Sequence, residues 1–206
     1  MIDRSSPSLT PAVEGVSSRR RILRAGGLGV LSAAAVALLA GNEAMAQQQR
    51  RQGQAAGPND VAILNVALGL EHEAINAYQI GAESNLLQPA VLQVAVAFQG
   101  HHKAHRDALV ATIRQMSGTP AGEKTRQEYM QSLNAASIRS QTDILKLAQR
   151  LERGAANAYL GVIPSFTNRD LAKVAGRLAA DETMHYTALT QALNEALPGQ
   201  ALSFGA

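Results

Sequence analysis

The sequence predicts an all-α protein folded as an antiparallel four-helix bundle. Alanine, leucine and glutamine are abundant and β-branched residues are not clustered, which favours helix over sheet. From residue 58 onward, four long helical segments are separated by two short turns and one longer crossover, which is the plan of a four-helix bundle. Because 46% of the 206 residues are hydrophobic, the chain can form one substantial core.

The first two predicted helices form a hairpin. The first runs from about residue 59 to residue 83, and Asn59 or Asp60 can serve as its N-cap. A polar turn follows at 84–88. Pro89 suits the first turn of the second helix, which we expect to end near Ser117.

The last two predicted helices form a second hairpin. The third helix runs from about residue 138 to residue 163, where Pro164 stops it. Thr167 or Asn168 then caps a fourth helix that ends near Leu197. The crossover before this hairpin can hold a short helix within 123–136. The bundle domain is thus expected at 58–197, with a C-terminal tail at 198–206.

Residues 1–46 have the order of a secretory leader. A basic stretch that contains Arg19, Arg20 and Arg21 precedes a modest apolar run and the sequence Ala44-Met45-Ala46. The paired arginines resemble a twin-arginine signal peptide, which implies the twin-arginine export machinery as a partner, cleavage after about Ala46 and a periplasmic protein. The apolar run is shorter than the roughly 20 residues of a spanning helix, so we expect no stable membrane anchor. A disordered linker is expected at 47–57.

Charge and cysteine content exclude several functions. Without the leader, 14 Lys and Arg stand against 13 Asp and Glu, so the net charge falls to +1 and no nucleic-acid footprint remains. The chain has no cysteine, which excludes disulfides, a thiolate metal site and a cysteine nucleophile. A homo-oligomer remains possible.

One phrase occurs twice. Residues 70–78 read LEHEAINAY and residues 151–159 read LERGAANAY, with six identities in nine positions. Each copy carries a glutamate, Glu71 or Glu152, followed seven residues later by Tyr78 or Tyr159. Seven helical steps return to nearly the same face. Each tyrosine could therefore be a core residue with a buried partner, a hydrogen-bond donor to a nearby carboxylate, or a redox group.

Two further pairs share the helix depth of these glutamates. Glu182 with His185, and His102 with His105, are spaced i and i+3 and so project from one helix face. In each predicted hairpin, the glutamate and the facing pair lie about 16 residues, or roughly 24 Å, from the connecting turn. Buried carboxylates at one level need a cation to balance them, which predicts a metal site. Imidazole with carboxylate suits Fe, Mn or Zn.

This order of motifs resembles that of the ferritin-like di-metal carboxylate proteins. The local sequences LEHEAINAY, HRDAL, LERGAANAYLG and DETMH are similar to those of exported bacterial ferritin-like proteins, which are related to plant desiccation-associated proteins. The resemblance covers about residues 58–197. It implies two Fe or Mn ions, with Glu71 as a terminal ligand of one and Glu152 of the other, while His185 would bind one ion and His105 the other. Glu182 would bridge them.

Residue 102 departs from that pattern, because the family has a second bridging glutamate where this chain has His102. An imidazole nitrogen coordinates one ion, so the site could hold one ion, or prefer Zn or Cu. The resemblance implies an oxidase, a ferroxidase or a peroxide-reactive protein of stress defence. The alternative is a non-enzymatic stress or structural bundle with a degenerate or mononuclear site.

Several other polar residues near these motifs are not expected to coordinate a metal ion. Of the three neighbouring histidines, His101 is expected to face solvent. Asp107 or Asp181 could support a ligand histidine. The remaining candidates are expected to be solvated or capping residues: His72, Glu73, Glu83 and Glu128.

Overall fold

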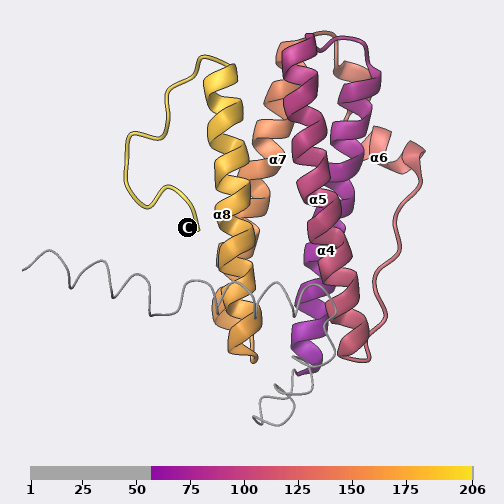
Figure 1. Ribbon diagram of the computed structural model, residues 1–206, viewed down its shortest axis with the longest axis vertical. Coiled ribbons are helices and arrows are strands. Elements are labelled where there is room, and N and C mark those ends of the chain that lie inside the picture. The colour runs from indigo at the N-terminus through magenta and orange to yellow at the C-terminus, as the bar shows by residue number, and fades with distance from the viewer. Residues whose placement is uncertain (1–56, 206) are drawn as a thin grey trace, which may run out of the picture. The chain divides into compact units, whose positions relative to one another are not determined.

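Four long helices form the body of the protein in a computed structural model that describes residues 57–205 (Figure 1). No strand occurs among these residues, which confirms the predicted all-α fold class. The predicted leader and nearly all of the predicted linker lie outside the described residues. The four helices are α4 (Pro58–Glu83), α5 (Pro89–Gln115), α7 (Gln141–Val162) and α8 (Arg169–Ala192).

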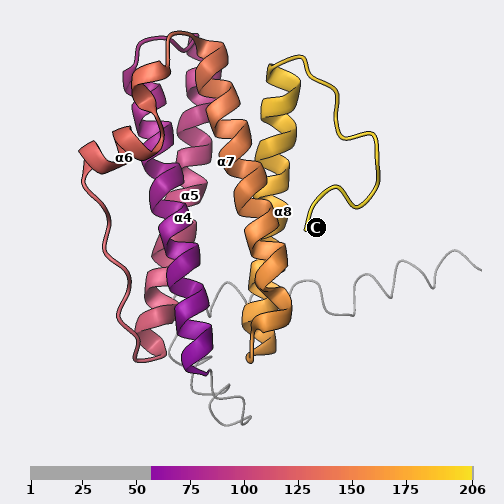
Figure 2. The ribbon, with the colours of Figure 1, turned by 180° about the vertical axis from the view of Figure 1, so that it is seen from behind.

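The helices are arranged as two antiparallel hairpins. Helix α4 packs on α5 and α7 packs on α8, and the hairpins join chiefly through α4 and α7 (Figure 2). Glycine permits one close approach along this seam, because a Cβ added to Gly81 would lie 2.8 Å from Cγ2 of Ile144. Helices α5 and α8 are not among the main packing pairs.

The crossover between the hairpins runs along the outside of α4 and contains α6 (Arg126–Ser132) and a 3₁₀ turn at Ala135–Ser137 (Figure 1). The short helix expected within 123–136 is therefore confirmed. Side-chain hydrogen bonds attach the crossover to α4, from Asn65 Nδ2 to the carbonyl of Thr119 and from Asn76 Nδ2 to Glu123. His72 lies between these two attachments and is buried, so the expectation that it is solvated was wrong.

The start of α4 differs from the prediction. Gly57 is the N-cap, whereas Asp60 lies inside the first turn and accepts a hydrogen bond from the Gly57 backbone N–H. Asp60 is fully buried and also accepts from the backbone N–H groups of Thr167 and Asn168, at 2.8 and 3.1 Å. This aspartate therefore ties the start of α4 to the turn between α7 and α8.

The ends of α7 and α8 confirm one prediction and correct two. Asn168 caps α8 as expected, since its side chain accepts from the N–H of Asp170. Helix α7 begins later than predicted because Ser140 caps it and accepts from the N–H of Asp143. Helix α8 ends at Ala192 instead of near Leu197, because Asn194 takes the left-handed conformation at φ 55°.

The C-terminal segment folds back against the second hairpin. The ring of Phe204 packs edge-on against Tyr186 of α8, and the N–H of Gly205 donates to Asn157 of α7. Within the described residues, no helix combines the length and apolar character needed to cross a membrane.

The apolar core is divided into layers along the bundle. One layer lies toward the turn between α7 and α8 and includes Leu68, Ile113 and Leu171. Another lies toward the opposite end and includes Phe98 and Leu145. Between the two layers, all four helices turn polar side chains inward.

Candidate metal centre

The structure brings together all six residues that the sequence singled out as ligands. Five are almost completely buried and His105 is 11% exposed. Their donor atoms form two groups, each with every donor within 4.8 Å of the others. The first group is Glu71, His102, His105 and Glu182; the second is His102, Glu152, Glu182 and His185.

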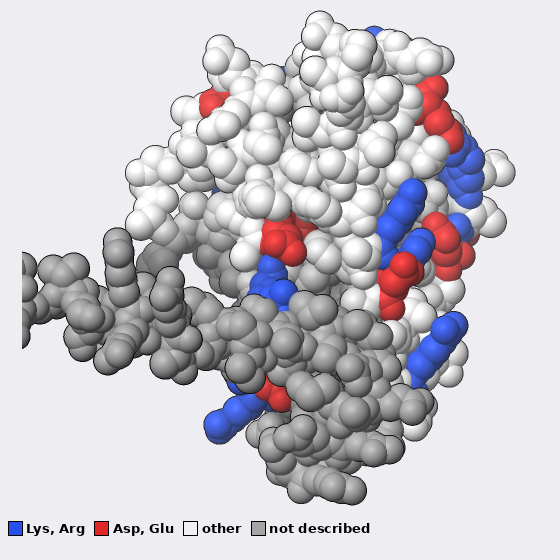
Figure 3. Space-filling view, in the orientation of Figure 1, with Lys and Arg blue, Asp and Glu red and all other residues white. Residues whose placement is uncertain are grey.

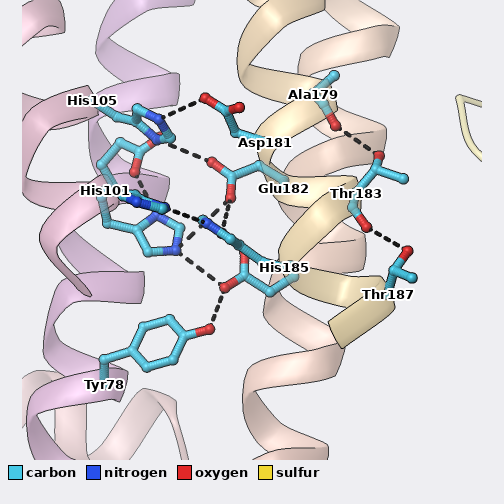
Figure 4. A network of polar contacts seen from close by, with 12 residues as sticks. Tyr78, His101, His105, Ala179, Asp181, Glu182, Thr183, His185 and Thr187 are labelled. Carbon is cyan, nitrogen blue, oxygen red and sulfur yellow. Dashed lines mark hydrogen bonds and ion pairs between the residues drawn. The ribbon is translucent and has the colours of Figure 1, made fainter. Parts of the chain in front are cut away.

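The arrangement follows from helix geometry. His102 and His105 project from one face of α5, and Glu182 and His185 project from one face of α8. Figure 4 shows His105 and His101 on one side of the centre and Glu182 and His185 on the other. His102 and Glu182 belong to both groups, so these two residues occupy the positions at which a bridge between two ions would lie.

His102 lies between the glutamates of the two repeats. Its Nδ1 is 2.8 Å from Oε2 of Glu71, and its Nε2 is 3.1 Å from Oε1 of Glu152. Burial by itself lowers the pKa of His102, but the hydrogen bonds to Glu152 and Glu71 outweigh it and raise this pKa to about 11. In the metal-free chain, His102 is thus a buried cation held between two carboxylates.

His105 faces Glu182 and extends the centre toward the surface. Its Nδ1 is 3.3 Å from Oε1 of Glu182 and 3.6 Å from Oε1 of Glu71. Its Nε2 is 3.3 Å from the exposed carboxylate of Asp181, so the support expected from Asp107 or Asp181 comes from Asp181. Burial lowers the pKa of His105, and the contacts with Glu182 and Glu71 more than reverse this and raise it to about 10.

His185 is fixed on both sides of its ring. Its Nδ1 lies 3.0 Å from Oε2 of Glu182 and 3.5 Å from Oε2 of Glu152. Its Nε2 lies 2.9 Å from Nδ1 of His101, which is solvent-exposed as predicted but also contacts the centre. The ring of Phe98 stacks on His185 with the centroids 4.1 Å apart.

The two tyrosines of the repeat contact the opposite repeat. The hydroxyl of Tyr78 donates to Oε1 of Glu152, and the hydroxyl of Tyr159 donates to Oε1 of Glu71. Burial and the neighbouring carboxylates raise the pKa of both phenols well above the usual value, so both stay protonated as donors. Of the roles left open by the sequence, the structure shows the hydrogen bond to a carboxylate.

Glu71 and Glu152 are held in the ionised form. Burial raises the pKa of Glu71 and of Glu152, but the hydrogen bonds and charges of the surrounding histidines outweigh burial and lower both pKa values. In each case the first compensating contact comes from His102. The centre therefore presents carboxylates in the protonation state that binds metal ions.

The donor set fits a metal ion. Three buried atoms that point into the centre make ion-pair contacts of 3.3 Å or longer but no hydrogen bond within the described residues: His105 Nδ1, Glu152 Oε2 and Glu182 Oε1. Buried polar atoms without hydrogen bonds are costly, and each of the three is a nitrogen or oxygen of a type that binds Fe, Mn or Zn. An ion in the first group would lie within reach of His105 and Glu182, and an ion in the second group within reach of Glu152.

Phe98 and His101 were not singled out as parts of the site. Both follow from the helix repeat, because residues 98, 101, 102 and 105 are spaced i, i+3, i+4 and i+7 along one face of α5. Of the three histidines within residues 101–105, only His102 and His105 were assigned to the site from the sequence. That spacing is the signal that would have placed Phe98 and His101 beside them.

Comparison with known proteins agrees with the fold. The family model described as "Ferritin-like domain" matches residues 59–195. A crystal structure of a conserved hypothetical protein from Mycobacterium tuberculosis is similar at 25% sequence identity and a TM-score of 0.58, covering 66% of this chain and 98% of that one. The search of curated proteins gave no match. Since the family model spans most of the chain and all six clustered residues, this protein belongs to the ferritin-like domain family.

Proposed function

We propose that the protein binds one or two Fe or Mn ions at this centre and uses them in oxidation by dioxygen or peroxide, as an oxidase or ferroxidase in stress defence. The observation that carries the proposal is the pair of overlapping donor groups that share His102 and Glu182. A bound Fe or Mn ion would supply the redox chemistry. Glu71 and His105 would hold one ion, Glu152 and His185 the other, and Glu182 would contact both.

The chain's own residues prepare the centre for that role. The hydroxyls of Tyr78 and Tyr159 orient Glu152 and Glu71, and His101 orients His185. The apolar layers above and below exclude bulk water from the carboxylates. Since His101 and His105 lie nearest the surface, a small reactant or a ferrous ion would enter past them.

Metal analysis of the full-length protein tests the proposal. The chain is stripped with a chelator and reconstituted anaerobically with Fe(II), Mn(II) or Zn(II). Bound metal is then counted by mass spectrometry. Wild type is expected to retain at least one ion, whereas Glu182→Ala and His185→Ala lose it and the exposed control Asp107→Ala keeps it. Wild type that retains none of the three metals would refute the proposal.

A second candidate is a non-enzymatic stress or structural protein with a degenerate site. It is favoured by His102, which places a buried cation between Glu71 and Glu152 and reduces the room for two divalent ions. Oxygen consumption with ferrous iron separates the two functions. Consumption by wild type that disappears in His185→Ala supports the oxidase, and metal binding without consumption supports the second candidate.

We also propose, from the leader, that the protein is exported by the twin-arginine pathway and acts in the periplasm, and, from the motifs of the bundle, that it is related to the desiccation-associated proteins. That pathway carries folded proteins, so metal could be loaded before export. Fractionation of cells that express wild type or an Arg19→Lys, Arg20→Lys double variant tests this. Wild type is expected in the periplasmic fraction as a chain shortened to about Gln47, and the variant in the cytoplasm at full length. Equal distribution would contradict export.

A further inference from the structure

A cavity of about 260 Å³ lies between α5 and α8, in the half of the bundle nearest the α4–α5 turn. Fourteen residues line it, none of them charged. Its floor is formed by α4 and α7, which contribute Tyr78, Leu145 and Ala148. Figure 3 shows that this part of the surface, between α8 and α5, has few charged side chains.

The cavity results from small residues at facing positions. Helix α5 contributes Ala95 and α8 contributes Ala188, so neither wall fills the space between them. The helices do not close it themselves, because each packs mainly on its own hairpin partner. At the rim, Ala90, Val94 and Ala192 are exposed, so the cavity opens to solvent.

The inner end of the cavity abuts the metal centre. Phe98 lines the cavity, and its ring also stacks on the ring of His185. Tyr78 lines it as well, but its hydroxyl is already engaged by Glu152. The only polar side chain of the lining therefore has its partner, and what the cavity presents to an occupant is apolar.

The size of the cavity identifies the kind of occupant. One turn of helix with its side chains fills a cylinder of roughly 400–600 Å³, which is larger than this cavity, so a helix of a second copy does not fit inside it. A dry apolar cavity of about 150 Å³ can hold benzene. By proportion, this one holds a molecule of up to about ten heavy atoms.

We propose that this cavity is a binding site for a small apolar molecule, such as a hydrocarbon chain of up to about ten carbons. The molecule would lie against Phe98 and Tyr78. The ring of Phe98 would separate it from His185, and the ring of Tyr78 would separate it from Glu152. Binding requires only the apolar walls and so does not depend on a bound metal. The proposal therefore stands or falls separately from the proposed oxidation chemistry.

Calorimetric titration of the metal-free, full-length protein with n-alkanols from pentanol to decanol tests the site. Each added methylene is expected to strengthen binding about four-fold until the cavity is full. Ala95→Leu and Ala188→Leu fill the cavity from opposite walls and should each weaken octanol binding at least ten-fold. Ala97→Leu and Ala180→Leu, at exposed positions of the same two helices, should bind as wild type does.

Two results would overturn the proposal. One is wild type that binds no alkanol, or whose affinity does not depend on chain length. The other is binding that survives both filling variants, which would place the alkanol elsewhere. If wild type binds none and the filling variants change the oligomeric state on a sizing column, a second copy covers this face instead. Thermal unfolding identifies a filling variant that fails to fold. Octanol binding by the other filling variant then tests the proposal.

Discussion

Tyr78 and Glu152 belong to different hairpins, and the Tyr78 hydroxyl donates its hydrogen bond to Oε1 of Glu152. Tyr159 and Glu71 repeat this contact in the opposite direction. The duplicated phrase of the sequence is thus paired crosswise, with the tyrosine of each copy bound to the glutamate of the other. These two bonds set the relative height of the hairpins at the level of the metal centre.

Removing either phenolic hydroxyl should weaken both stability and metal binding. Tyr78→Phe and Tyr159→Phe each remove a phenol donor from a buried carboxylate oxygen, which we expect to lower the free energy of unfolding by about 1–3 kcal/mol. Metal affinity should fall about ten-fold because the carboxylate loses its orientation. Urea unfolding and Mn(II) titration measure these effects. Tyr186→Phe is the control, since Tyr186 contacts Phe204 and Arg153 through its ring; equal effects in all three variants would contradict the assignment.

Replacing His102 with glutamate should strengthen binding of a second ion. The change removes a buried cation from between Glu71 and Glu152 and supplies a carboxylate that can contact two ions. Anaerobic Mn(II) titration should show the second binding step at least ten-fold tighter in His102→Glu than in wild type. His102→Ala separates the two causes, because it removes the cation without adding a carboxylate. A second step no tighter in His102→Glu than in His102→Ala would show that the added carboxylate contributes nothing.

His101 should affect metal affinity more than stability. Its ring is exposed, but its Nδ1 holds Nε2 of His185. His101→Phe keeps a ring beside His185 without the hydrogen bond, and we expect metal affinity to fall about ten-fold. The free energy of unfolding should change by less than about 0.5 kcal/mol, as is usual for surface positions. The exposed neighbour Lys103 supplies the control variant Lys103→Ala, and unchanged affinity in His101→Phe would show that His185 needs no such support.

Asp60 should be among the most sensitive positions far from the centre. Asp60→Ala removes the acceptor for three backbone N–H groups, those of Gly57, Thr167 and Asn168. We expect a loss of about 2–4 kcal/mol of unfolding free energy, measured by urea unfolding. Asp107→Ala removes an exposed carboxylate as the control and should change stability by less than about 0.5 kcal/mol. Similar losses in both variants would mean that these hydrogen bonds contribute little.

The fold and the grouping of the six candidate residues were accessible from the sequence because both depend on regular spacing. Helices of this length can be predicted from composition and from the turn residues that separate them. Side chains that lie equally far from the turn of their hairpin are placed at one level of the bundle. The i, i+3 pairs at 102/105 and 182/185 fixed which faces meet. No long-range information was needed for those steps.

The missed features depend on contacts between segments far apart in the chain. Asp60 was one of two candidates for the N-cap of α4, but it lies inside the first turn, and its carboxylate also serves the turn at residues 167–168, more than 100 residues away. His72 was expected in water, and the crossover covers it. Helix α8 stops at Ala192 because Asn194 adopts a left-handed conformation that helix propensity alone does not reveal.

Neither hairpin contains a complete donor group. Each group takes three of its four residues from one hairpin and the fourth from the other: Glu182 completes the first group and His102 completes the second. A metal ion in either group would act as a crosslink between the hairpins, closing a chain loop of about 50 to 80 residues across the crossover. Metal binding would then favour the docked hairpins over any state in which they separate, and a hairpin on its own would hold an incomplete set of ligands.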